Sequence, residues 1–556
     1  IVQLDMWKWT VADMAMMQLA LISGDEPFSE MEKTADVLRK RIEKIPSIRK
    51  VNYYGLPGQE IHVSLDFEKM AMVNTSLDHI TRAISSSNMN IPGGDIKLGA
   101  SNLSVKSSGS FQNLEEIRSC VVNSYQGRLI YLRDVAEVKF EYEERKHLTR
   151  FAAKHMFQEN GGGERCIFIG ISQKEGLNVL ETNEELQPVI EAFEEELPEN
   201  MKLEVVYNQP NTVKSRINDF VNNLLQGVAL VALIIFLSLV FRSSLVVAMA
   251  IPLSLTIGLG FVDLAGFGLQ QISIAGLVVV LGMLVDNSIV MVENINRFIQ
   301  MGHSKREASI LAASEIGWPV ISATLTTILA FVPIAAMPDM TGNFIKSLPV
   351  TIMITLTVSL LVALTFTPMI TSSLFKDRAT KEVKARGIAR LLRWIIEKPF
   401  RTTLRLALKR PLLSLFLAFL YLAGSTAMFS KVDISFFPKA EQPNLMIQAS
   451  LPEGSSLLKT DEVARYVERV LDTMPEVSYY ATNVGQGNPQ IYYNVFPRRQ
   501  DIRHAEIYVQ LYDFEPEAFA RTLAKLRKEF DLYPGARIRV KEFEQGIPFD
   551  APVQIF

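Results

Sequence analysis

The chain has 556 residues, of which 48% are apolar and 21% are charged, with a formal net charge of −3. This length allows several domains, and the mixture of apolar and charged residues indicates membrane spans joined to soluble lobes. The small net charge gives no support for a nucleic-acid partner. Two cysteines are too few for a disulfide framework. The chain begins at Ile1 without an initiator methionine, so we expect a fragment of a longer protein.

Residues 1–219 have the alternating helix and strand patterns of a soluble α/β region. The glycine-containing stretch 92–109 is predicted to be a β-hairpin arm. The other predicted elements of this region are helices at 28–44, 76–87 and 178–197 and strands at 48–54, 58–66 and 202–209.

An internal repeat links two distant parts of the chain. Residues 32–55 resemble residues 458–485, because each has an amphipathic helix, a proline that stops it, and a strand carrying Tyr-Tyr. The pattern predicts two related βαβ lobes, one before and one after the apolar central block.

The central block contains six stretches that are long and apolar enough to cross a bilayer as helices. An even number of spans puts both lobes on the same side. The connection 376–410 holds twelve Lys or Arg against three acids, so the positive-inside rule places it in the cytoplasm and the lobes outside. An apolar stripe over 388–396 predicts a helix lying along the inner membrane surface. The predicted spans are 220–241, 243–262, 264–292, 316–338, 347–375 and 411–430.

The third span carries an acid in its apolar run. On a helix Asp286 shares one face with Gly282 and Glu293, and Asn287 lies beside it. A carboxylate at this depth is costly and normally has a function. We therefore expect Asp286 to carry a proton or ion relay, with Gly282 allowing a neighbouring helix to approach closely. The alternative is that Asp286 is paired with a basic residue for packing alone.

The string GMLVDNSIVMVENINRF, which contains Asp286, resembles the fourth-helix signature G-x-x-V-D-D-[AS]-I-V-V-x-E-N of resistance–nodulation–division (RND) efflux permeases. Asp286 matches the first Asp of that pair, and Asn287 replaces the second. The resemblance covers essentially the whole chain. It implies an α+β membrane protein in which a polytopic helical bundle carries periplasmic βαβ (ferredoxin-like) porter subdomains.

The resemblance also divides the chain into segments. It implies a partial porter subdomain over 1–58, a docking-type subdomain over 59–142 with its arm at 92–109, a return to the porter subdomain over 143–219, five transmembrane helices over 220–375, a basic cytoplasmic helix over 376–410, a sixth span over 411–430 and a partial second porter lobe over 431–556. One span before the first lobe and five after the second would lie outside this chain. A lysine on one of those later helices would be the partner of Asp286.

In function, the resemblance implies proton-driven efflux of drugs, detergents and bile salts from the bacterial inner membrane, without a cofactor. The implied partners are two further copies in a homotrimer, a periplasmic membrane-fusion adaptor, an outer-membrane channel protein, the lipid bilayer and a small-molecule substrate. An intramembrane aspartyl protease is the enzyme alternative. Its G-x-G-D spacing is not present around Asp286, and no second acid lies in mid-span.

The segment SYYATNVGQGNPQIYYNVF corresponds to the substrate pocket and switch loop of the family. It predicts pocket residues Tyr480, Tyr492, Tyr493 and Phe496 and a switch loop of Gly485, Gln486, Gly487 and Asn488. The alternative is that these aromatic residues fill one face of a sheet. A copper- or silver-exporting branch is the competing function, because it also keeps a single Asp and uses methionine thioethers, for which Met446 is the candidate. No histidine pair has metal-ligand spacing, so we predict no metal site.

Overall fold

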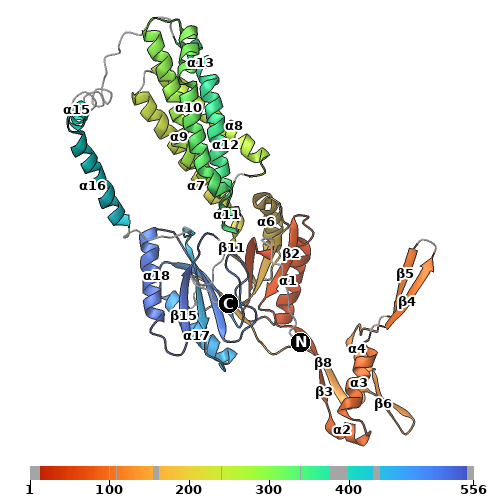
Figure 1. Ribbon diagram of the computed structural model, residues 1–556. Coiled ribbons are helices and arrows are strands. Elements are labelled where there is room, and N and C mark those ends of the chain that lie inside the picture. Colours follow the sequence, from red (N-terminus) through yellow and green to blue (C-terminus); the bar gives the residue numbers. More distant parts are fainter. Residues whose placement is uncertain are drawn as a thin grey trace.

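The computed structural model describes residues 13–89, 91–98, 101–107, 109–154, 162–238, 241–268, 270–338, 340–375, 399–429 and 439–546. A helical bundle stands at one end, two α/β lobes lie together below it, and a smaller unit with a projecting hairpin extends to the side (Figure 1). This arrangement confirms the predicted combination of membrane-length apolar helices with lobes built from helices and strands.

The first lobe is a βαββαβ unit. Its strands pair antiparallel in the order β11-β1-β10-β2, and α1 and α6 supply apolar side chains to its core. The unit is assembled from both ends of the first 208 residues, with residues 59–142 inserted in its middle. Its elements are β1 (Met17–Ile22), α1 (Phe28–Ile42), β2 (Ile48–Tyr54), β10 (Glu164–Gln173), α6 (Val179–Glu195) and β11 (Lys202–Asn208).

The second lobe repeats this topology. Its strands lie in the order β13-β14-β12-β15. Numbered along the chain within the lobe, this order is second, third, first, fourth. The first lobe has the same order, which is that of a ferredoxin-like unit. The two Tyr-Tyr pairs lie in equivalent second strands, β2 and β13, which confirms the internal repeat predicted from the sequence. Its elements are β12 (Asn444–Ser450), α17 (Leu457–Asp472), β13 (Val477–Val484), β14 (His504–Leu511), α18 (Pro516–Phe530) and β15 (Arg537–Glu542).

One strand joins the lobes into a nine-stranded sheet. β9 (Leu148–Ala153) pairs along its whole length with β13 of the second lobe and at Arg150 and Phe151 with the start of β10. The predicted domain boundary assigned the region 143–219 to the first lobe alone. In the structure, β9 of this region also pairs with the second lobe. Because one sheet contains strands of both lobes, both lie on the same side of the bundle, as predicted.

The inserted region 59–142 stands on a two-stranded stem of β3 and β8. The predicted hairpin arm is present as β4 paired with β5. The small core under the arm includes Leu132 and Val135, both fully buried. The elements are β3 (Gln59–Leu65), α2 (Phe67–Met72), α3 (Leu77–Ser87), β4 (Ile91–Leu98), β5 (Ser101–Ser107), α4 (Leu114–Arg118), β6 (Val121–Tyr125), β7 (Arg128–Tyr131), α5 (Leu132–Val135) and β8 (Ala136–Tyr142).

The described residues contain six helices long and apolar enough to cross a membrane, as predicted. Five form a bundle in which α9 is central and contacts α7, α8, α10 and α12. The sixth, α16, has no buried residue and stands apart from the bundle (Figure 1). The bundle and its neighbours comprise α7 (Gln209–Ser238), α8 (Phe241–Leu264), α9 (Gln271–Gln300), α10 (Lys305–Ala335), α11 (Met340–Ile345), α12 (Ser347–Leu364), α13 (Phe366–Leu374), α15 (Arg401–Lys409) and α16 (Pro411–Phe429).

The helix bounds differ from the charge-free stretches for local reasons. The chain turns at Gly266, whose φ of +81° ends α8 and delays the start of α9 to Gln271. α10 begins eleven residues before its predicted span because the Ser304 hydroxyl caps it, accepting a hydrogen bond from the backbone N–H of Glu307. The predicted surface stripe at 388–396 lies outside the described residues.

Candidate functional site

Asp286 lies near the middle of α9, on the face predicted for it. Gly282, Asp286, Val290 and Glu293 are all exposed along this face. Among the described residues no side chain forms a hydrogen bond or ion pair with Asp286. The sequence led us to expect a carboxylate enclosed by protein. Within this chain it is exposed, because no described helix covers this face.

The opposite side of α9 is fixed by polar contacts to its neighbours. Asn287 Nδ2 donates to Thr324 Oγ1 of α10 at 3.2 Å, and Thr324 is buried. Ser359 Oγ of α12 donates to the Leu284 carbonyl at 3.0 Å, and Ser288 Oγ lies 3.4 Å from Thr367 Oγ1. Asp286 is therefore presented on a helix whose rotation is restrained from two directions.

Gly282 does not have the close neighbour predicted for it among the described residues. A Cβ placed there would have no atom within 4 Å. Close helix approach occurs instead at Gly276, where a Cβ would lie 3.0 Å from the Leu348 carbonyl oxygen, and at Gly258, where it would lie 3.1 Å from Thr355. The role predicted for Gly282 stays a prediction.

Two of the predicted pocket residues belong to the lobe core. Tyr480 is fully buried, and its hydroxyl donates to Asp472 Oδ1 at 2.8 Å. Met446 is also buried, in the core between the lobes. The alternative that alternate aromatic residues fill a sheet face is therefore correct for Tyr480, and neither side chain is open to a ligand. The described residues hold no group of three or more His, Cys, Asp or Glu that could bind a metal.

The other predicted aromatics separate into two groups. Tyr492 and Tyr493 line a cavity of about 390 Å³ at the junction of the second lobe with the start of α7 and α9. The Tyr493 ring stacks on Phe344 of α11, with centroids 6.2 Å apart. Phe496 is exposed and does not line this cavity.

Arg216 of α7 forms part of the same cavity wall. Its guanidinium donates to the backbone carbonyls of Ala440 and Glu441, which connects α7 to the chain entering the second lobe. No acidic residue is among the described residues that line the cavity. The cavity thus combines an aromatic wall with one cation, a combination that suits an amphiphile with a polar or anionic head.

The predicted switch loop is a buried connection between the lobes. Gly485, Gly487 and Asn488 are buried, and Gln486 is half-buried. Asn488 Nδ2 donates to Gln18 Oε1 of the first lobe at 3.2 Å, and the backbone N–H of Asn488 donates to Glu506 Oε2 at 2.9 Å. These contacts fix the loop, so this structure does not show the mobility that the glycines predicted.

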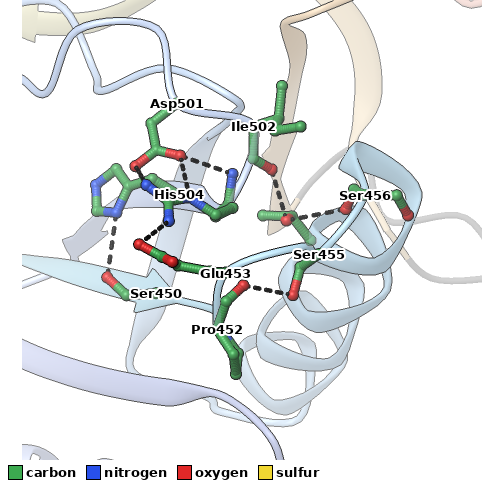
Figure 2. Close-up of polar contacts among 10 residues, drawn as sticks. Ser450, Pro452, Glu453, Ser455, Ser456, Asp501, Ile502 and His504 are labelled. Carbon is green, nitrogen blue, oxygen red and sulfur yellow. Dashed lines mark hydrogen bonds and ion pairs between the residues drawn. The ribbon is translucent and has the colours of Figure 1, made fainter.

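The base of this loop is closed by two backbone hydrogen bonds near the start of β14, and Figure 2 shows the neighbouring contacts of Asp501, Ile502 and His504. The Gly485 N–H donates to the His504 carbonyl at 2.8 Å, and the Asp501 N–H donates to the Gly485 carbonyl at 2.9 Å. Arg503 Nε donates to Asp501 Oδ1 at 3.0 Å, and this guanidinium lowers the pKa of the Asp501 carboxyl. Thr460 of α17 donates to the Ile502 carbonyl at 2.7 Å.

A comparison with protein families decides the identity of the chain. Residues 2–547 match the model of the AcrB/AcrD/AcrF family. The chain belongs to this family. It is therefore an RND-type efflux permease, which confirms the resemblance drawn from the Asp286 signature. RND permeases are transporters rather than enzymes, so the protease alternative is discarded.

Several residues that shape this part of the permease could not be identified from the sequence. Gln18 and Asn488 lie 470 positions apart, and only the folded sheet brings them together. Arg216 was visible within the junction string YNQPNTVKSRINDF, but nothing in that string says that it faces a cavity. Thr324 is one of many hydroxyls in apolar helices, and its contact with Asn287 follows from helix packing.

Proposed function

We propose that this permease uses the proton motive force to export small amphiphilic compounds such as drugs, detergents and bile salts. In this proposal the bundle lies in the bacterial inner membrane and both lobes lie in the periplasm. The protein works as a homotrimer with a periplasmic adaptor and an outer-membrane channel. The copper- or silver-exporting alternative is less well supported, since Met446 is buried in the lobe core.

The observation that carries this proposal is the position of Asp286. It is an acid in the middle of a membrane-length helix, and its side chain has no hydrogen-bond or ion-pair partner among the described residues. The same helix is restrained on its other side by Thr324 and Ser359. Binding or releasing a proton at Asp286 changes the charge of an uncovered helix face by one, which can shift its packing against another part of the protein.

The test of the relay is Asp286→Asn in the full-length permease. The substitution keeps the size of the side chain and removes its titration, so we expect efflux to fall to the level of a deletion strain. Because Asp286 is exposed and has no partner among the described residues, the thermal stability of the purified protein should stay unchanged. Accumulation of a fluorescent amphiphilic dye in cells measures the efflux.

Glu293→Gln is the matched control, since Glu293 is an exposed acid on the same face, about two turns closer to the helix end. We expect this variant to keep most of the efflux. Normal dye export by Asp286→Asn would contradict the relay, and equal loss in both variants would show that the face needs negative charge rather than a proton carrier.

The substrate class is tested at the junction cavity. Tyr493→Ala removes an aromatic wall, so we expect increased susceptibility to dyes, detergents and bile salts, with no change for copper or silver. Phe496→Ala is the control, because its side chain is exposed outside the cavity. Increased susceptibility to metals alone would favour the metal-exporting branch.

A further inference from the structure

An open groove of about 610 Å³ lies between α10 and the α12–α13 pair. It sits at the end of the bundle away from the lobes, where α9 ends and α10 begins (Figure 1). Its volume is within the range of about 300–1,000 Å³ that is typical of ligand sites. None of the described lining residues is acidic.

The groove is lined by apolar side chains together with the serines Ser309, Ser314 and Ser372. Ala313 and Gly317 lie one turn apart on its floor, and a Cβ at Gly317 would meet no atom within 4 Å. Ile310 and Trp318 form the α10 wall and are 61% and 74% exposed, while Met369 of α13 lies opposite and is 58% exposed. Exposed apolar side chains on a membrane-length helix fit a hydrocarbon chain.

A cation stands at one end of these apolar walls. Arg306 lies in the first turn of α10 and lines the groove, and it has no ion-pair partner among the described residues. The neighbouring acid, Glu307, is turned to His303, with His303 Nδ1 and Glu307 Oε1 3.3 Å apart. Trp318 lies three turns further along α10 and lines the same groove.

We propose that this groove is a specific site for one anionic phospholipid. The lipid phosphate pairs with Arg306, and an acyl chain lies along Ile310, Trp318 and Met369. One cation beside exposed apolar side chains suits a phosphate headgroup joined to an acyl chain, whereas a free phosphate would leave those apolar side chains uncovered. The inference does not depend on what the permease transports.

The site is tested by native mass spectrometry of the full-length protein, purified from nanodiscs with equal phosphatidylglycerol and phosphatidylethanolamine. We expect wild type to retain phosphatidylglycerol preferentially. Arg306→Gln should reduce this preference about fivefold, the effect of one basic residue at a membrane surface. Arg242→Gln, at an arginine in the first turn of α8 that does not line the groove, should leave this preference unchanged.

A second variant tests the apolar part of the site. Gly317→Leu places a side chain on the open floor of the groove, so we expect it to reduce the retention of both lipids without unfolding the helix. An unchanged phosphatidylglycerol preference in Arg306→Gln would overturn the proposal. Equal losses in Arg306→Gln and Arg242→Gln would also overturn it, because the preference would then come from general surface charge.

Discussion

His147 shows how one side chain can couple the contact between the lobes to pH. Its Nδ1 accepts a hydrogen bond from the Gly55 N–H at 3.2 Å, so the ring proton sits on Nε2, 3.3 Å from Asn483 Oδ1. Gly55 ends a strand of the first lobe and Asn483 lies in a strand of the second. Burial lowers the pKa of His147 from 6.5 to about 4, although the hydrogen bond with Asn483 opposes this shift.

The consequence is a loss of stability in acid. Between pH 6.5 and 4 the unfolded chain protonates this imidazole and the folded protein does not, so the free energy of unfolding falls as the pH falls through this window. At about 1.4 kcal/mol per pKa unit, the loss is at most about 3.5 kcal/mol. Thermal unfolding of His147→Gln should therefore depend less on pH than that of wild type. The exposed His79→Gln is the control, and an equally steep profile in both variants would contradict the assignment.

Among the secondary-structure elements, β9 and α17 are joined by a buried ion pair. Arg150 of β9 donates from Nε to Glu468 Oε1 at 2.9 Å and also pairs with Asp461. The side chains of Arg150 and Glu468 are 7% and 1% exposed. Burial raises the pKa of Glu468 even though Arg150 opposes this shift. The carboxylate therefore depends on its partner to stay charged.

Arg150→Met removes that partner while keeping most of the apolar stem. We expect the free energy of unfolding to fall by about 3–5 kcal/mol at pH 7, since a buried carboxylate is left uncompensated. Arg465→Met is a suitable control because Arg465 also pairs with Asp461 but is half-exposed, so its loss should cost less than about 1 kcal/mol. Adding Glu468→Leu to Arg150→Met should restore much of the lost stability. A double variant no more stable than the single one would contradict this account.

The elements also show what could be predicted from the sequence. Spans, caps and lobes follow local rules, so the six membrane helices and the repeat around the two Tyr-Tyr pairs were predicted correctly. Two properties depend on neighbours that only the fold brings together, and these properties were not predicted. β9 pairs with β13, over 300 residues away, and Tyr480 points into a core rather than a pocket. Alternation along a strand defines two faces but does not say which one is covered.

At the scale of the whole molecule, β9 makes the second lobe dependent on the first half of the chain. Thr149 of β9 lies opposite Asn483 and Phe151 opposite Ala481. Without β9, the backbone of β13 from Tyr479 to Val484 would have a free edge in the centre of a buried surface. A free edge of this kind promotes pairing with other chains.

This dependence predicts the behaviour of the second lobe expressed alone as residues 439–546. We expect it to self-associate through the β13 edge, and a peptide of residues 146–154 to bind that edge by β-strand addition and return the lobe to a monomer. Analytical ultracentrifugation and hydrogen exchange at β13 measure the two effects. The same peptide carrying Arg150→Ala should bind more weakly, because it lacks the contacts with Glu468 and Asp461. A lobe that is monomeric and protected at β13 without any peptide would show that the shared strand is dispensable.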